Sequence, residues 1–195
     1  MSIGGKRKRR SERKELLLLL LLRLEGPIGR YALKHMLGMA EHEGRVRQML
    51  ADLQEDGYVS ASRRGSKLTV KGEEHLNQQL KTYNIADIKE VAIPPLEMGA
   101  VSIGIHLKGK ASAIRSGMKQ RDAAVRGGAS GATILTFKEG VLSIPTVYRN
   151  LSSEHLNLVT QIHRSFSLTE ADVLIITSAQ DLGKALEGAL ATALC

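Results

Sequence analysis

The sequence predicts a protein of the α+β or mixed α/β class, built from two domains. Three observations predict this class. Residues 46–53 place apolar side chains at helical spacing, and residues 101–107 alternate them at the spacing of a β-strand. Between these two patterns stand Pro94 and Pro95, which disfavour both a helix and a central strand. We therefore expect a mainly helical N-terminal domain and a smaller mixed α/β C-terminal domain, and 195 residues suffice for both.

Charge separates the same two regions. Residues 1–84 hold 17 Lys and Arg against 10 Asp and Glu, a balance of +7, whereas the remaining residues hold 11 against 10. A basic surplus confined to one domain favours a partner rich in phosphate over general solubility. Aromatic content of 3% argues against a stacking platform for single-stranded nucleic acid.

Composition also bounds the compartment and the chemistry. Cys195 is the only cysteine, which excludes a disulfide framework and a thiolate-rich zinc site. Residues 16–22 are seven leucines, too few to span a bilayer, and no cleavage site follows them. We expect a cytoplasmic protein without a membrane partner.

The N-terminal domain begins with two different segments. Residues 1–11 contain five consecutive cations and are expected to form a disordered basic arm, which either stays solvated or follows a phosphate backbone. Residues 12–24 are expected to form a helix that is buried on more than one side, because its leucine run is apolar all round. Gly26 and Pro27 end it.

The central stretch gives the domain its outline. Residues 30–37 form a short helical pattern, and a longer one follows with Val46, Met49, Leu50 and Leu53 on one face. Two alternating runs, residues 58–62 and 67–70, flank a polar turn that carries two arginines. A closing helix over residues 72–82 completes the order helix, turn, helix, hairpin, helix.

This outline resembles the winged helix-turn-helix of bacterial and archaeal repressors, over residues 12–85. The resemblance implies a transcriptional regulator that binds double-stranded DNA as a homodimer. The outer face of the helix that contains Val46 and Leu53 would enter the major groove, and the hairpin tip would contact phosphate. The residues expected at DNA are Gly44, Arg45, Arg47 and Gln48 on the helix, with Arg63, Arg64, Ser66 and Lys67 on the hairpin.

One feature departs from the repressor pattern. About two extra residues precede the helix expected to enter the major groove, and Glu41 and Glu43 place carboxylates there. These charges suit the helix dipole but repel phosphate, so the base-contacting residues stay open. The alternative is that this face of the helix is solvated and does not contact DNA.

Residues 86–97 are expected to be a linker, and residues 98–195 a second domain of order β-α-β-β-α-β-α. Strands are expected over residues 98–107, 132–138, 141–144 and 172–177, and helices over 116–126, 152–164 and 180–194, the last capped by Ser178.

The most unusual part of the second domain is a helix end that runs into a glycine-rich turn. Free backbone amides of Gly127 and Gly128, with Arg121, Asp122 and Arg126 nearby, can hold a small anionic effector. An ordinary glycine cap on a solvated helix is the competing interpretation, because nucleotide-binding glycine loops lie between strand and helix, not helix and strand.

The segment from Arg121 to Thr133, with the later Ile144 and Pro145, resembles a largely uncharacterised C-terminal domain fused to winged helices in archaeal proteins. This resemblance implies an effector-binding or dimerising module. Fusions of winged helices to riboflavin kinases and biotin ligases keep open an enzyme with a regulatory appendage, and a winged helix used only for protein contacts is a third hypothesis. No catalytic motif, cofactor motif or metal-ligand spacing is recognisable, so we expect no enzyme activity.

Overall fold

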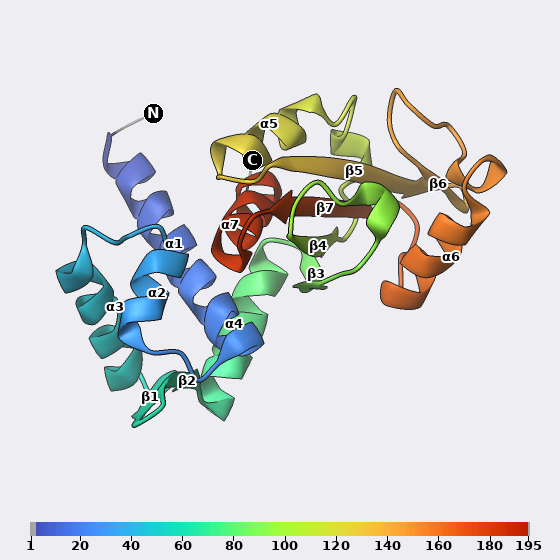
Figure 1. Ribbon diagram of the computed structural model, residues 1–195. Helices are drawn as coiled ribbons and strands as arrows, with labels where there is room; N and C mark the ends of the chain where they lie inside the picture. Colours follow the sequence, from blue (N-terminus) through green and yellow to red (C-terminus); the bar gives the residue numbers. More distant parts are fainter. Residues whose placement is uncertain (1–2, 195) are drawn as a thin grey trace. The chain divides into compact units, whose positions relative to one another are not determined.

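The fold is described from a computed structural model, which defines the backbone of residues 3–194 and the side chains of residues 12–194 (Figure 1). Across these residues it contains seven α-helices and two antiparallel sheets, so the mixture of helix and sheet that we expected is confirmed. The chain divides into unit 1, Met1–Leu80, and unit 2, Lys81–Cys195. Unit 2 is the larger of the two, contrary to expectation.

Unit 1 contains four helices and one hairpin. Its elements are α1 (Ile3–Glu25), α2 (Arg30–Met36), α3 (Glu43–Glu55), β1 (Val59–Ser62), β2 (Gly65–Leu68) and α4, which begins in this unit and spans Val70–Thr82. Residues 16–22 of α1 are each at most 3% exposed, which confirms that the leucine run is buried. The basic arm expected over residues 1–11 lies within α1 from Ile3 onward, and its side chains lie outside the described residues.

The turn between β2 and α4 corrects one expected boundary. Val70 was expected to end a strand, but it is the first residue of α4 and is 79% exposed. The Thr69 hydroxyl explains the change, because it accepts a hydrogen bond from the Gly72 amide at 3.0 Å and donates one to the Gly57 carbonyl at 2.7 Å. It therefore satisfies a free amide at the start of the helix.

Unit 2 is built on a five-stranded sheet. The elements are β3 (Ile85–Glu90), β4 (Val101–Leu107), α5 (Met118–Arg126), β5 (Gly131–Lys138), β6 (Val141–Ser143), α6 (Leu156–Ser165), β7 (Val173–Ala179) and α7 (Leu182–Ala193). From β4 to α7 this is the order that the sequence predicts. The strands lie in the order β3-β4-β7-β5-β6, and every neighbouring pair is antiparallel. The last strand of the chain is thus the central one.

The predicted linker over residues 86–97 is wrong for most of its length. Its first part pairs with β4 as the edge strand β3, and Pro94–Leu96 forms a short 3-10 helix. The register shifts between Ile85 and Asp87, so Ile85 and Ile88 both face the core although they are three residues apart. This bulge hides the strand, because it breaks the alternation that identifies strands in a sequence.

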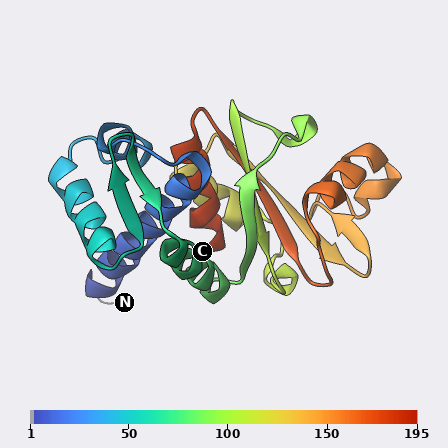
Figure 2. The same cartoon turned by 90° about the horizontal axis from the view of Figure 1, so that it is seen from below.

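Helices cover both faces of the sheet (Figures 1 and 2). On one face, Leu135, Leu174 and Ile176 form a core with Leu158 and Ile162 of α6. The opposite face carries α5 and α7, and Leu182, Leu186 and Leu190 of α7 are buried there. Asp181 caps α7 by accepting a hydrogen bond from the Lys184 amide at 2.9 Å, and Ser178, the expected cap, is instead a buried residue of β7.

Candidate nucleic-acid interface

The outer face of α3 carries the residues that the sequence assigns to DNA. Val46, Leu50 and Leu53 are buried in unit 1, which fixes the rotation of the helix, while Met49 is half-buried. A step of 100° per residue then turns the opposite face outward, and Gly44, Arg45, Arg47 and Gln48 are all exposed. The structure therefore brings these four together on one surface.

The two halves of this surface differ in charge. Arg45 and Arg47 stand in the first turns of α3, and neither forms an ion pair with any described residue. Further along, the Gln48 side-chain amide donates to Asp52 at 2.7 Å, one turn away. Asp52 is exposed and negative, so the first half of α3 is the half suited to an anionic partner.

The carboxylate of Glu43 is compensated by α2. Its side chain lies 3.2 Å from Lys34 Nζ and 3.5 Å from Arg30 Nη2. The hydrogen bond from Lys34 and the charges of Lys34 and Arg30 hold the pKa of Glu43 below its usual value. Of the two carboxylates that conflict with phosphate binding, the charge of Glu43 is therefore offset, and α2 supplies two cations beside α3 that the sequence interpretation missed. Lys34 also lies 4.7 Å above the Tyr31 ring.

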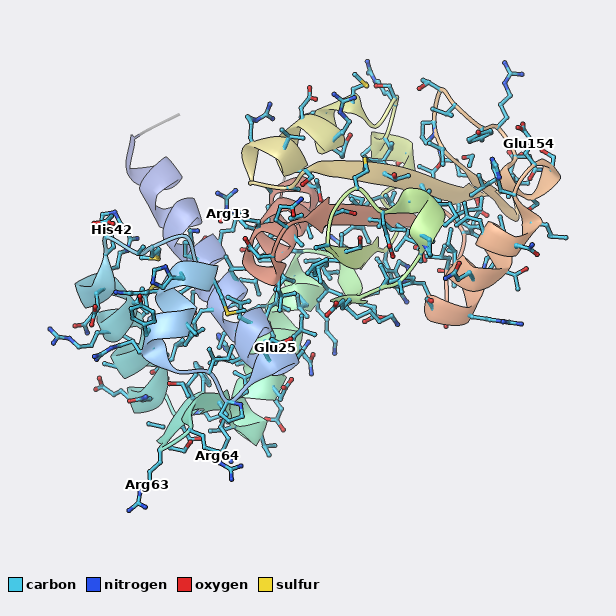
Figure 3. All side chains as sticks on the ribbon, viewed as in Figure 1. Arg13, Glu25, His42, Arg63, Arg64 and Glu154 are labelled. Atoms are coloured by element: carbon cyan, nitrogen blue, oxygen red, sulfur yellow. The ribbon has the colours of Figure 1, made fainter. Side chains whose placement is uncertain are left out.

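The hairpin presents two arginines at its tip. Ser62 pairs with Gly65, which leaves Arg63 and Arg64 as a two-residue turn. Both side chains point away from the ribbon (Figure 3), and neither pairs with a carboxylate among the described residues. The Ser62 hydroxyl accepts from the Arg64 amide at 3.2 Å and donates to the Gly65 carbonyl at 2.9 Å, which steadies the turn. Lys67 is exposed on the adjoining strand.

Ser66 is the one expected DNA contact that the structure removes from this surface. It is only 7% exposed, and its backbone exchanges two hydrogen bonds of 2.9 Å with Ile28. Ile28 thereby forms an isolated antiparallel β-bridge with β2. Gly65 makes this approach possible, since a Cβ atom there would lie 2.4 Å from the Ile28 carbonyl carbon.

The glycine turn expected to hold an anion is occupied by its own helix. The Gly127 amide donates to the carbonyls of Ala123 and Ala124, and the Gly128 amide donates to Val125. A Cβ atom at Gly127 would lie 3.0 Å from Gly188, so this glycine allows α5 to pack against α7. The geometry matches the glycine-cap alternative, because these two amides are not free.

The charged residues of that segment lie at the surface. Arg121, Asp122 and Arg126 are exposed, and the Arg121 and Asp122 side chains approach each other at 3.8 Å. Of the five expected ligand residues, Arg121 lines a small surface cavity, and the other four are not among the lining residues of that cavity.

A buried hydrogen bond links His106 of β4 to Asp172, the residue before β7. His106 Nε2 lies 2.7 Å from Asp172 Oδ2, and both side chains are almost fully buried. The carboxylate also accepts hydrogen bonds from the Gly109 amide, the Thr169 amide and the Thr169 hydroxyl. Burial alone would raise the pKa of Asp172, but these hydrogen bonds outweigh it, and the pKa lies below its usual value. Such a saturated carboxylate has a structural role.

Two general findings bound the chemistry. Within residues 12–194, no cluster of three His, Cys, Asp or Glu side chains is arranged to hold a metal ion. Among the described helices, none combines the length and the apolar character needed to cross a membrane.

Comparison with known proteins places unit 2 in a family. Residues 98–195 match the model of a domain of unknown function, DUF4443. The solved structure of the hypothetical protein PH0730 from Pyrococcus horikoshii OT3 is similar over 92% of this chain and 90% of its own, with a TM-score of 0.64 and 26% identity. A search of curated proteins gives no match.

Proposed function

The chain belongs to the DUF4443 family of domains of unknown function, and from unit 1 we propose that it is a transcriptional regulator that binds duplex DNA. The observation that carries this proposal is the pairing of two exposed basic elements in one unit. Arg45 and Arg47 lie on the first half of α3, and Arg63 and Arg64 lie at the hairpin tip.

The order of elements supports a winged helix-turn-helix. Helices α1, α2 and α3 precede the hairpin, and Ile28 forms an isolated β-bridge with β2. In this proposal α3 lies in the major groove with its N-terminal residues toward the base edges, and the hairpin follows the phosphate backbone. Figure 1 shows α3 and the hairpin as neighbouring elements.

Each residue then has a distinct role. Arg45 and Arg47 are the candidates for guanine, whose O6 and N7 accept two hydrogen bonds from one guanidinium. Gln48 must release Asp52 before it can bind adenine through both ends of its amide. Gly44 leaves space for close approach, since nothing lies within 4 Å of its Cβ position. Arg63, Arg64 and Lys67 are assigned to phosphates.

The test is a salt series with the full chain and a duplex of mixed sequence, followed by fluorescence anisotropy. The double variant Arg63→Gln/Arg64→Gln should lower the slope of log affinity against log salt by about 0.9 for each phosphate that the variant no longer neutralises. A matched control, Lys119→Gln/Arg164→Gln, removes two exposed cations from unit 2. An unchanged slope in the hairpin variant, or an equal decrease in the control, refutes the assignment.

We extend the proposal to a homodimer, because one helix in one groove reads few base pairs. Dimeric helix-turn-helix proteins bind half-sites about 34 Å apart. Light scattering of the full chain, with and without DNA, measures the oligomeric state directly. A monomer in both states contradicts the dimer while leaving the DNA proposal standing.

A further inference from the structure

A basic groove lies on unit 2, and of the five residues that the sequence assigned to an anion only Arg121 lines part of it. Its main cavity has a volume of about 470 Å³, within the usual range of small-molecule sites. The floor is formed by Thr136 and Lys138 of β5 and by Ser143 of β6. One wall is the segment before α5, with Arg115, and the other is the loop of residues 144–149, with Arg149.

Three cations line this cavity without a carboxylate among its lining residues. Arg115, Lys138 and Arg149 are exposed, and none of them forms an ion pair with another residue in the described part of the chain. Like charges gathered on one concave surface repel each other, so a bound dianion relieves that repulsion. Two guanidinium groups also match the geometry of phosphate oxygens.

The floor adds hydroxyl groups with defined positions. Thr136 and Ser143 face each other across β5 and β6, with 2.8 Å between their side-chain oxygens. The Ser143 hydroxyl also approaches the Thr136 carbonyl at 3.3 Å, which orients the pair. Each hydroxyl has a single proton, so either one must release its present partner before it can donate to an oxygen of a ligand.

A second, smaller cavity of about 230 Å³ continues the groove. It shares residues 144–147 with the first and lies along the same side of β5, over Ala132 and Ile134. Its lining is more apolar, and it includes Met118 and Val147, which are 51% and 65% exposed. Exposed apolar side chains beside a basic cavity indicate room for a ligand that has an organic part.

We propose that this groove binds a small organic phosphate. The phosphate lies among Arg115, Lys138 and Arg149, and the organic part covers Ile134 and Val147. A phosphate monoester carries a charge of about −1.5 to −2 at neutral pH, which three cations can balance. The inference rests on the proposed function only where it makes this ligand an effector of DNA binding; the binding itself is independent of unit 1.

Calorimetric titration of the full chain tests the site with three probes: inorganic phosphate, phenyl phosphate and AMP. At least one organic phosphate should bind with a Kd below about 1 mM and more tightly than inorganic phosphate. Arg115→Gln/Arg149→Gln should weaken that binding about tenfold or more, because charge-assisted hydrogen bonds are removed. Both arginines are exposed, so the fold should survive, and circular dichroism checks this.

Controls separate the parts of the proposal. Arg126→Gln/Arg164→Gln removes two exposed cations that do not line either cavity and should leave the affinity unchanged. Val147→Ser should weaken the binding of the organic phosphates and leave the binding of inorganic phosphate unchanged. Equal affinity for all three probes overturns the role of the apolar cavity, and retained affinity in Arg115→Gln/Arg149→Gln overturns the site.

Three outcomes relate this inference to the DNA proposal. If Arg63→Gln/Arg64→Gln abolishes DNA binding while phosphate titrations are unchanged, the two sites are separate, as proposed. If a short duplex displaces the organic phosphate from that same variant, the groove is a nucleic-acid surface and the small-molecule assignment is wrong. If phosphate binding shifts DNA affinity, the ligand is an effector.

Discussion

The two candidate sites differ in how the chain assembles them. In unit 1 the exposed cations of α3 and the hairpin tip come from one short stretch, residues 43–67. In unit 2 the groove is built from a segment before α5, two strands and the loop that follows the second of these strands. A surface made by one helix and one hairpin can be predicted from the spacing of residues that are close in the sequence. A groove forms only when the strands pair. Each unit also offers its own test of stability, a close backbone approach at Gly65 in unit 1 and a buried, hydrogen-bonded carboxylate, Asp172, in unit 2.

The largest expected effect tests the buried bonds of unit 2. Asp172→Ala removes one partner of the His106 pair and leaves the Gly109 and Thr169 groups without their acceptor. Breaking a buried pair on one side costs about 3 to 5 kcal/mol of unfolding free energy. Urea denaturation measures this cost. The control Asp122→Ala alters an exposed carboxylate on α5 and should change stability by less than about 0.5 kcal/mol. Equal effects would contradict the role of Asp172.

The corresponding test in unit 1 is Gly65→Ala. The new methyl would meet the backbone of Ile28 and Gly29 at a φ of +127°, where side chains are strained. We expect a destabilisation of about 2 to 4 kcal/mol from strain and overlap together. Gly140→Ala serves as control, because it also has a positive φ, +73°, but no atom lies within 4 Å of its Cβ position. A similar cost for both would show that φ, and not the contact with Ile28, is responsible.

Acid sensitivity offers a finer comparison. The folded-state pKa of Asp172 is lowered, so its stabilising contribution is present above the unfolded-state pKa of about 3.9 and is lost as pH falls through the folded value. Asp172→Asn should therefore flatten the dependence of stability on pH below about pH 4. Denaturation midpoints across that range test this, and an unchanged profile would exclude Asp172 as a source of acid sensitivity.

The α3 surface predicts a change in sequence choice. Arg45→Gln and Arg47→Gln should each reduce discrimination between preferred and altered duplexes by about 1 to 3 kcal/mol. Competition binding against duplexes altered at single base pairs measures the discrimination. Arg63→Gln serves as the comparison and should weaken binding to all duplexes by the same factor. Reduced affinity with unchanged discrimination in the α3 variants would assign Arg45 and Arg47 to phosphates.

The smallest expected effect concerns Glu43. Glu43→Gln removes a negative charge from the start of α3 and frees Lys34 and Arg30. DNA affinity should rise slightly, by less than about tenfold, and the gain should fade with added salt. Glu55→Gln, at the far end of α3, is the matched control. Weaker binding by the Glu43 variant would show that the carboxylate positions the α2 cations usefully.

The sequence predicted those parts of the fold that depend on regular spacing. Val46, Leu50 and Leu53 fixed the face of α3, and the seven elements from β4 to α7 follow the predicted order. The edge strand β3 was missed because its bulge places Ile85 and Ile88 on one face at a spacing of three. Thr69 was not recognised as the residue that starts α4, because its hydroxyl acts across the chain on Gly57.

The candidate sites show the same limit. Arg45 and Arg63 could be chosen from the sequence, since a helix face and a turn are local. Ser66 was chosen as well, and its burial depends on Ile28, 38 positions earlier. Arg115, Lys138 and Arg149 share no motif or periodicity, so no sequence signal identified them as neighbours.

The central position of β7 determines when unit 2 can form. Because β4 and β5 both pair with β7 and not with each other, the sheet stays in two separate pieces until residues 173–179 have been synthesised. Unit 1 is enclosed within the first 80 residues and needs no such late segment. During translation, the arginines proposed to contact DNA can therefore reach their final arrangement while the groove at β5 and β6 still awaits its central strand.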